Sequence, residues 1–339
     1  MYKRILFLPF FILVFIACKN NALDIDISEI DVKPLPVLRL EDDLFSINPE
    51  NFDVKNKEIQ AKYGTFYGHY IQGFMNAGGT QDSLYKTTLL GFAADKDMKQ
   101  TYAYVKKLYP NATIEEINNE LTNCVKRFKY HFPKRKLPTR LITCTTGFNY
   151  SVAYMDSALV LGLDMHLSDT AVFYQMLTLP KYQTRMMNQE YILPNITKGW
   201  LLTEFDNDSV VNTLLYHTIF YGKLFYAMNA LLPNTNDSIL IGYNSKQMKF
   251  IDDNEKNIWG YFAEKNRLYE NNLKTIQELT TDGPSTSAIN PKECPPRIAM
   301  WIGWQIVRSY MKNNEDVTLE QLMAEKDSQK ILSKSKYRP

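Results

Sequence analysis

Three charged residues fall on the apolar faces of two segments near the C-terminus. From Met248 to Phe262 the apolar residues recur at helical spacing, and Glu255 lies on the same stripe. A carboxylate that faces a protein core is costly unless a cation pairs with it. In the segment PPRIAMWIGWQIVRSYM, Arg297 and Arg308 share one helical face with two tryptophans. We therefore predict a buried polar cluster in which Glu255 pairs with Arg297 or Arg308; a polar centre within a ligand groove is the alternative.

Metal and nucleophile chemistry find no support in the spacing of the residues that would carry them. A helical zinc site needs two histidines one turn apart. None of the four histidines precedes a glutamate, and no two lie within five residues of each other: His69, His131, His166 and His217. Glycine-rich phosphate loops and a Gly-x-Ser-x-Gly elbow are also absent from the sequence. We predict no catalytic residue, no metal, no cofactor and no enzymatic activity.

One cysteine stands at the end of a short apolar segment. Lys3 and Arg4 precede thirteen mostly apolar residues, fewer than the roughly 20 that cross a bilayer. The segment ends in Phe15-Ile-Ala-Cys18, which resembles a bacterial lipobox with Phe in place of the usual leading Leu. In a lipobox the chain is cut before the cysteine, and the cysteine receives acyl chains such as palmitate. We predict lipidation of Cys18; an ordinary signal peptide with an unmodified Cys18, or a buried helix, is the alternative.

Charge and cysteine usage restrict the class of protein further. The net charge of +2 over 339 residues creates no strong field toward nucleic acid, and no zinc-finger or RNA-binding signature is present. We therefore expect no nucleic-acid partner. Beyond Cys18 the chain has Cys124, Cys144 and Cys294. Export would permit a disulfide, but an odd number leaves at least one thiol free, and the sequence does not select a pair.

The pattern of apolar residues predicts one mostly helical α+β domain with a small β-sheet. Three or four strands are expected after Pro36, within residues 137–146 and on both sides of a turn at Asp156-Ser157. Helical periodicity covers most of the remainder. The expected helices are 114–130, opened by a capping box at Thr113, a central buried helix over 210–231, 244–269, 297–311, and one opened by a capping box at Thr318. The breaker-rich residues 280–296 predict a long loop.

These features divide the chain into four parts. Residues 1–17 are the expected signal peptide, 18–34 a membrane tether, 35–332 the globular domain and 333–339 a basic tail exposed to solvent. The sequence contains no internal repeat and no linker that would separate two folding units. A single domain of this size is large for one core but within the observed range.

Two long strings resemble one protein family. They are Tyr221–Tyr269 (YGKLFYAMNALLPNTNDSILIGYNSKQMKFIDDNEKNIWGYFAEKNRLY) and Cys294–Asn314 (CPPRIAMWIGWQIVRSYMKNN). Both are similar to the gliding motility lipoprotein GldB family. The resemblance implies a non-enzymatic, lipid-anchored protein of a cell-envelope membrane that is needed for the gliding machinery and the associated protein secretion. It implies membrane contact through lipidated Cys18 and partners among the other gliding or secretion proteins.

A weaker similarity concerns the order of the elements. A strand pair, a helix over 192–205 and a helix around Tyr221-Gly222 follow the order found in zinc peptidases of the gluzincin kind. Those enzymes carry His-Glu-x-x-His on the first helix and a glutamate on the second, whereas this chain has Leu193–Lys198 and Tyr221-Gly222 there. The similarity implies a degenerate zincin scaffold without metal ligands, and it requires a sheet edge beside the first helix. An envelope peptide-binding or hydrolase-like protein on this scaffold is the alternative function.

Overall fold

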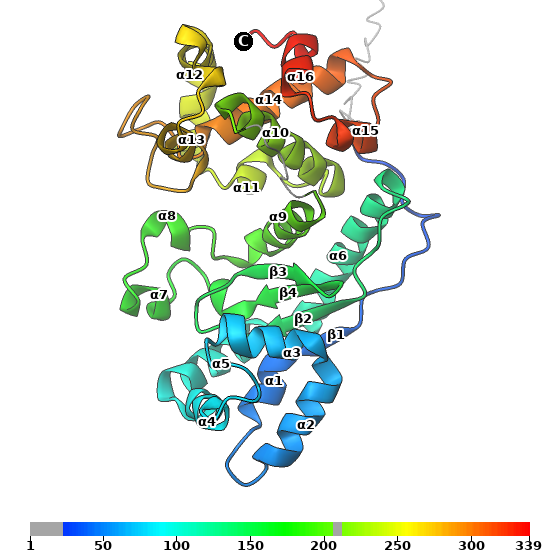
Figure 1. Ribbon diagram of the computed structural model, residues 1–339, viewed down its shortest axis with the longest axis vertical. Helices are drawn as coiled ribbons and strands as arrows, with labels where there is room; N and C mark the ends of the chain where they lie inside the picture. The colour runs from blue at the N-terminus through cyan, green and yellow to red at the C-terminus, as the bar shows by residue number, and fades with distance from the viewer. Residues whose placement is uncertain (1–22, 206–211) are drawn as a thin grey trace, which may run out of the picture.

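The computed structural model describes residues 23–205 and 212–339 (Figure 1). The predicted signal peptide and Cys18 lie outside these residues. The elements before the sheet is complete are β1 (Val37–Arg39), α1 (Leu40–Phe45), α2 (Phe52–Tyr63), α3 (Thr65–His69), the π-helix η1 (Tyr70–Phe74), α4 (Tyr85–Ala94), α5 (Lys96–Leu108), α6 (Asn111–His131), β2 (Arg140–Cys144), β3 (Val152–Met155) and β4 (Ala158–Gly162). The elements after it are η2 (Leu163–Met165), α7 (Val172–Met176), α8 (Lys181–Thr184), η3 (Gln189–Tyr191), α9 (Ile192–Glu204), α10 (Leu214–Leu231), α11 (Asp237–Ile241), α12 (Ser245–Ala263), η4 (Glu264–Tyr269), α13 (Leu273–Thr280), α14 (Ile298–Asn313), α15 (Leu319–Ala324) and α16 (Ser328–Ser335).

The predicted small sheet is confirmed and has the strand order β1-β2-β4-β3. β1, β2 and β4 run parallel, and β3 is an antiparallel edge strand joined to β4 by a hairpin. The hairpin turns at the predicted pair, where Asp156 and Ser157 have φ of 50° and 57°. Two successive residues with positive φ are typical of a turn that matches the twist of the flanking strands. The sheet is therefore built largely from local signals plus two long-range parallel pairings.

The sheet is buried on both faces, because its residues alternate between two apolar clusters. Ile142 and Val160 pack with the helices α1–α4 and η1 on one face. Leu141, Leu159 and Leu161 pack on the other face with α6, α9 and α10. Figure 1 shows the sheet between these two layers, with the C-terminal helices stacked beyond α9. The result is one α+β domain, as predicted.

The central buried helix expected over 210–231 is α10, whose described part begins at Leu214 with Thr213 as its N-cap. It crosses α14 at very short range, since a Cβ atom added at Gly222 would overlap the Gly303 backbone and one added at Gly303 would overlap the Thr218 carbonyl. Two glycines thus permit a helix contact that no larger residue allows. Packing against α14 therefore requires glycine at position 222, and no ligand role is needed to explain this residue.

Some helices begin where the capping residues in the sequence predicted, and others do not. The capping box at Thr318 is confirmed by reciprocal bonds between Thr318 and Gln321. The one predicted at Thr113 is wrong, because α6 starts at Asn111 after an extended Pro110 and places Thr113 inside the first turn. The loop expected over 280–296 is confirmed as an irregular segment after α13, and α14 follows it with Arg297 as a left-handed N-cap.

The two ends of the globular part differ from the prediction. The described part of the expected tether lies on α6, where the Arg127 guanidinium pairs with Asp24 at 2.6 Å and the Lys129 amine donates to the Asp31 carbonyl at 2.9 Å. The expected basic tail is not free either. α16 continues to Ser335, and the Tyr337 ring packs on Trp259 of α12. Apolar residues near both ends bury against the domain, so charge alone misplaced the boundaries.

Two further properties concern membranes and thiols. Among residues 23–205 and 212–339, no helix combines the length and the apolar content needed to span a bilayer.

Cys124, Cys144 and Cys294 are buried free thiols in different parts of the fold. Burial raises the pKa of Cys124 and of Cys294 to about 12, so neither forms a reactive thiolate near neutral pH.

Candidate functional site

The predicted cluster of Glu255, Arg297 and Arg308 does not form. Glu255 accepts a hydrogen bond from the Tyr337 hydroxyl at 2.6 Å, and Arg308 makes a two-pronged ion pair with Asp237 at 2.6 and 2.7 Å. Arg308 follows Arg297, the N-cap of α14, by eleven residues, which is roughly 16 Å at 1.5 Å per residue, so one carboxylate could not serve both. The apolar stripes were identified correctly. The partner of Arg308 comes from α11, and the partner of Glu255 comes from the segment after α16.

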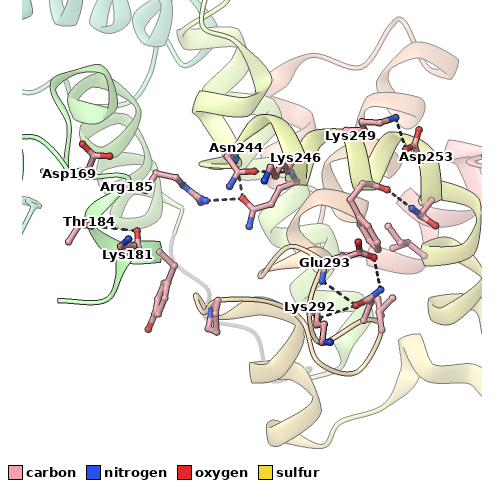
Figure 2. Close-up of a pocket in the computed structure, with 18 of the residues that line it drawn as sticks. Asp169, Lys181, Thr184, Arg185, Asn244, Lys246, Lys249, Asp253, Lys292 and Glu293 are labelled. Carbon is pink, nitrogen blue, oxygen red and sulfur yellow. Dashed lines mark hydrogen bonds and ion pairs between the residues drawn. The ribbon is translucent and has the colours of Figure 1, made fainter. Parts of the chain in front are cut away.

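A broad groove runs between the α7–α8 segment and α12, with the loop after α13 along one side (Figure 2). Its volume is about 1720 Å³, larger than the 300–1,000 Å³ typical of small-molecule sites. Basic side chains outnumber acidic ones in its lining, with Lys181, Arg185, Lys246, Lys249 and Lys292 against Asp169, Asp253 and Glu293. The groove suits an extended, mostly polar segment with acidic groups rather than a compact apolar ligand.

A smaller chamber of about 190 Å³ lies directly behind the wall of this groove. In three segments, neighbouring residues face opposite sides of the wall. The residues on the groove side are Arg185, Asn244 and Pro284. The corresponding residues on the chamber side are Met186, Gly242 and Asp282. The Arg185 guanidinium bridges the wall by donating to the Gly242 carbonyl and, at 2.9 Å, to Gln247 Oε1 at the start of α12. The chamber and the groove are therefore two compartments of one site.

Arg297 is the most buried charged residue of the chamber, with 5% of its surface exposed. Its left-handed backbone, with φ of 58°, lets the side chain turn inward at the start of α14. The guanidinium Nε lies 3.4 Å from Asp282 Oδ1 without the geometry of a hydrogen bond, and a terminal nitrogen reaches only Met186 Sδ at 3.9 Å. A buried guanidinium with open donors is costly unless something else accepts from it.

Lys198 enters the chamber from α9. Burial lowers the pKa of its amine to about 8, Arg297 acts in the same direction and Asp282 opposes both. Within the described part of the chain, the Lys198 amine lies 5.7 Å from the centre of the Phe225 ring in a cation–π contact, and it makes no hydrogen bond and no ion pair. Two cations therefore share this chamber with one carboxylate.

Asn195 also lines the chamber, and a buried histidine behind it sets its orientation. Nδ1 of His166 lies 3.1 Å from the Gly162 carbonyl, which can only accept, so this nitrogen carries the proton. Nε2 is then an acceptor for the Asn195 amide at 3.2 Å and the Ser151 hydroxyl at 3.3 Å. Burial lowers the pKa of His166 to about 4, so the ring is neutral at physiological pH. The amide end of Asn195 is thereby fixed at the lining of the chamber.

The degenerate zincin hypothesis meets one of its requirements. α9 packs on β3, the antiparallel edge strand, and Gly199 lets Val152 approach the helix closely. Pro194, Asn195 and Lys198 stand at the first, second and fifth positions of the His-Glu-x-x-His spacing, and all three line the chamber. Tyr221 and Gly222 do not line it. Kinship with zinc peptidases stays a prediction.

Metal-ligating residues do not gather anywhere in residues 23–205 and 212–339, where no three of His, Cys, Asp and Glu are grouped to hold an ion. Sequence reasoning missed the chamber residues Lys198, Asn195, Asp282 and Tyr191. One signal was available, since Lys198 is the only charge between Ile192 and Thr203 in an otherwise apolar helix.

Comparison with known proteins supports the resemblance seen in the sequence. A family model described as gliding motility protein GldB matches residues 20–339. The chain belongs to the GldB family. Searches of curated proteins and of solved structures each returned no match. For this GldB-family protein, the groove and the chamber are thus described from its own residues.

Proposed function

We propose that this GldB-family protein is a lipid-anchored, non-enzymatic component of the gliding machinery in the cell envelope, and that its groove holds a segment of another protein of that machinery or of the associated secretion apparatus. Family membership supports the part in gliding. The observation that carries the binding role is the groove itself, which exceeds the size of a small-molecule site and offers polar side chains from three separate segments (Figure 2).

Lipidation of Cys18 would also fix how the domain faces the membrane. Asp24 is held on α6 by Arg127, whose side chain is 9% exposed. Asp24 is six positions after Cys18 in the chain, and an extended chain covers at most about 3.5 Å per residue, or roughly 20 Å. Two or more acyl chains on Cys18 give stable anchoring. The C-terminal end of α6 would therefore stay within about 20 Å of the lipid surface.

Replacement of Cys18 by serine is expected to release the protein from the membrane, because no acyl chain would then hold it. Fractionation of cells followed by immunoblotting measures this effect. Wild-type protein should require detergent for release, whereas the Cys18→Ser variant should appear in the aqueous fraction. Equal membrane retention of both forms would contradict the anchoring proposal.

The binding role is tested by site-specific photo-crosslinking in living cells. A photoreactive residue at Lys249, exposed in the groove, should capture an identified gliding or secretion protein. The matched control is the same residue at Lys57, which is exposed on α2 and outside the groove. Equal capture at both positions, or capture of proteins unrelated to gliding, would contradict the proposal.

A further inference from the structure

The chamber behind the groove presents hydrogen-bond donors that have no acceptor. Arg297 and Tyr191 are each 5% exposed, and Lys198 is half-buried beside them. Among the described residues, no oxygen accepts a hydrogen bond from the Arg297 guanidinium, the Lys198 amine or the Tyr191 hydroxyl. Buried donors in proteins are nearly always satisfied by protein, water or ligand. Arg297 Nε is buried without a hydrogen-bond acceptor, and Lys198 and Tyr191 line the same cavity, so an incoming acceptor with several oxygen atoms could accept from all three groups.

The charge of the chamber selects the kind of acceptor. Lys198 and Arg297 supply two positive charges, and Asp282 is the only carboxylate in the lining. The excess within the lining is one positive charge, because Arg185 lines the groove side of the wall and donates there to the Gly242 carbonyl and to Gln247. A monoanion neutralises this excess, whereas a phosphate monoester, with nearly two negative charges at pH 7, would be repelled by Asp282. A carboxylate fits this balance better than a phosphate.

The size and the apolar lining restrict what the carboxylate is attached to. A volume of about 190 Å³ holds roughly six non-hydrogen atoms at about 30 Å³ each, the share of a water molecule in the liquid. Apart from Asn195, Thr280 and Gly242, the remaining lining is aliphatic or thioether, with Pro194, Ile239, Leu240, Ile241, Met186, Met228 and Met300. After three atoms of a carboxylate, the remaining space takes a stem of about three carbons.

We propose that the chamber binds one carboxylate on a short aliphatic stem. The carboxylate accepts from Arg297, Lys198 and Tyr191, and the stem lies against the methionines. Such a group occurs at the C-terminal residue of a polypeptide and in a free small carboxylic acid. If the carboxylate is a polypeptide C-terminus, the inference rests on the proposed function, since that end would come from a segment lying in the groove. If it is a free small acid, the inference does not depend on the proposed function.

The test uses butyrate, its neutral isostere butyramide and inorganic phosphate, titrated into the purified full-length mature protein in a non-ionic detergent and followed by NMR. Butyrate should bind, butyramide should bind at least about tenfold more weakly because it lacks the charge, and phosphate should bind more weakly than butyrate. Equal binding of butyrate and butyramide, or tighter binding of phosphate, would overturn the proposal.

Matched variants separate the chamber from the rest of the surface. Lys198→Met should weaken butyrate binding about tenfold or more, since one charged donor is lost. Asp282→Asn should strengthen it several-fold, because the competing carboxylate is removed; a gain of affinity cannot come from misfolding. Lys57→Met, on the distant helix α2, is the control and should bind butyrate as the wild type does. Unchanged affinity in both chamber variants would refute the site.

The source of the carboxylate is decided by a second pair of probes. A hexapeptide ending in a free alanine carboxylate, which fits the space for about three carbons, is compared with the same peptide ending in an amide. Tighter binding of the free acid than of butyrate assigns the chamber to a polypeptide end, whereas butyrate binding without any peptide preference assigns it to a small acid. Both results come from purified protein, so they are independent of anchoring and gliding.

Discussion

Replacing Gly303 by alanine is expected to lower the free energy of unfolding by about 3 kcal/mol, the upper end of the usual range for overpacking of a core, because backbone must move to admit the methyl group. The new methyl group would overlap the Thr218 carbonyl of α10, so the two most extensively packed helices would have to separate. α10 and α14 carry much of the larger apolar cluster, and their separation would loosen contacts along both. Denaturant unfolding followed by circular dichroism measures the loss.

Gly260→Ala is the matched control for this prediction. Gly260 lies within α12, and no atom comes within 4 Å of the Cβ position there. Alanine in a helix interior is better than glycine by roughly 0.5–1 kcal/mol, so this variant should be as stable as the wild type or slightly more so. If both alanine variants had the same stability, the close crossing of α10 and α14 would be wrong.

Acidification from pH 7.5 to 4.5 is expected to destabilise the protein, with His166 contributing roughly 2–3 kcal/mol of the loss. The pKa of His166 falls from 6.5 in the unfolded chain to about 4 in the fold. Between these values the unfolded chain binds more protons than the native state does. Stability is therefore complete above pH 6.5 and declines as the pH falls toward 4. A proton on Nε2 would face the Asn195 and Ser151 donors and would displace Asn195 from its place in the chamber.

The measurement is the pH dependence of unfolding in the wild type and in His166→Asn. The variant should lose roughly 2–3 kcal/mol less over the same interval, whatever its stability at pH 7.5. His131, whose pKa burial also lowers to about 4, should maintain part of the slope in both proteins. His69→Asn, at an exposed position, serves as control. Identical slopes in the wild type and His166→Asn would contradict a buried neutral His166.

The parts of the fold that followed from sequence are those set by neighbouring residues. The strand-like runs on both sides of the Asp156-Ser157 pair predicted the β3–β4 hairpin, since turn φ values depend on adjacent residues. The Thr318 capping box worked for the same reason. The Thr113 box had an identical local signal, yet Pro110 provided an earlier helix start. Where two local signals compete within a few residues, packing chooses between them.

The candidate site was less accessible to sequence reasoning. Arg297 was recognised as a charge on an apolar face, but its partner was assigned to Glu255 rather than to Asp282 in the preceding loop. Asp282 lies in a segment without periodicity, so no pattern indicated which way its side chain points. Lys198 showed only as a charge in an apolar helix, and the groove arises between α7–α8, α12 and the loop, which are far apart in the chain.

The amino-acid sequence alone determined where the strands lie, where several of the helices lie, that α10 is buried, and that the chain resembles GldB, because each depends on residue type at short range or on long similar strings. It also carried the prediction of an anchor at Cys18. Only the tertiary structure decided that Lys198, Arg297, Tyr191 and Asp282 surround one chamber. Helical periodicity tells which face of a helix is apolar; which turn of a distant element meets that face is set by the packing of the whole domain.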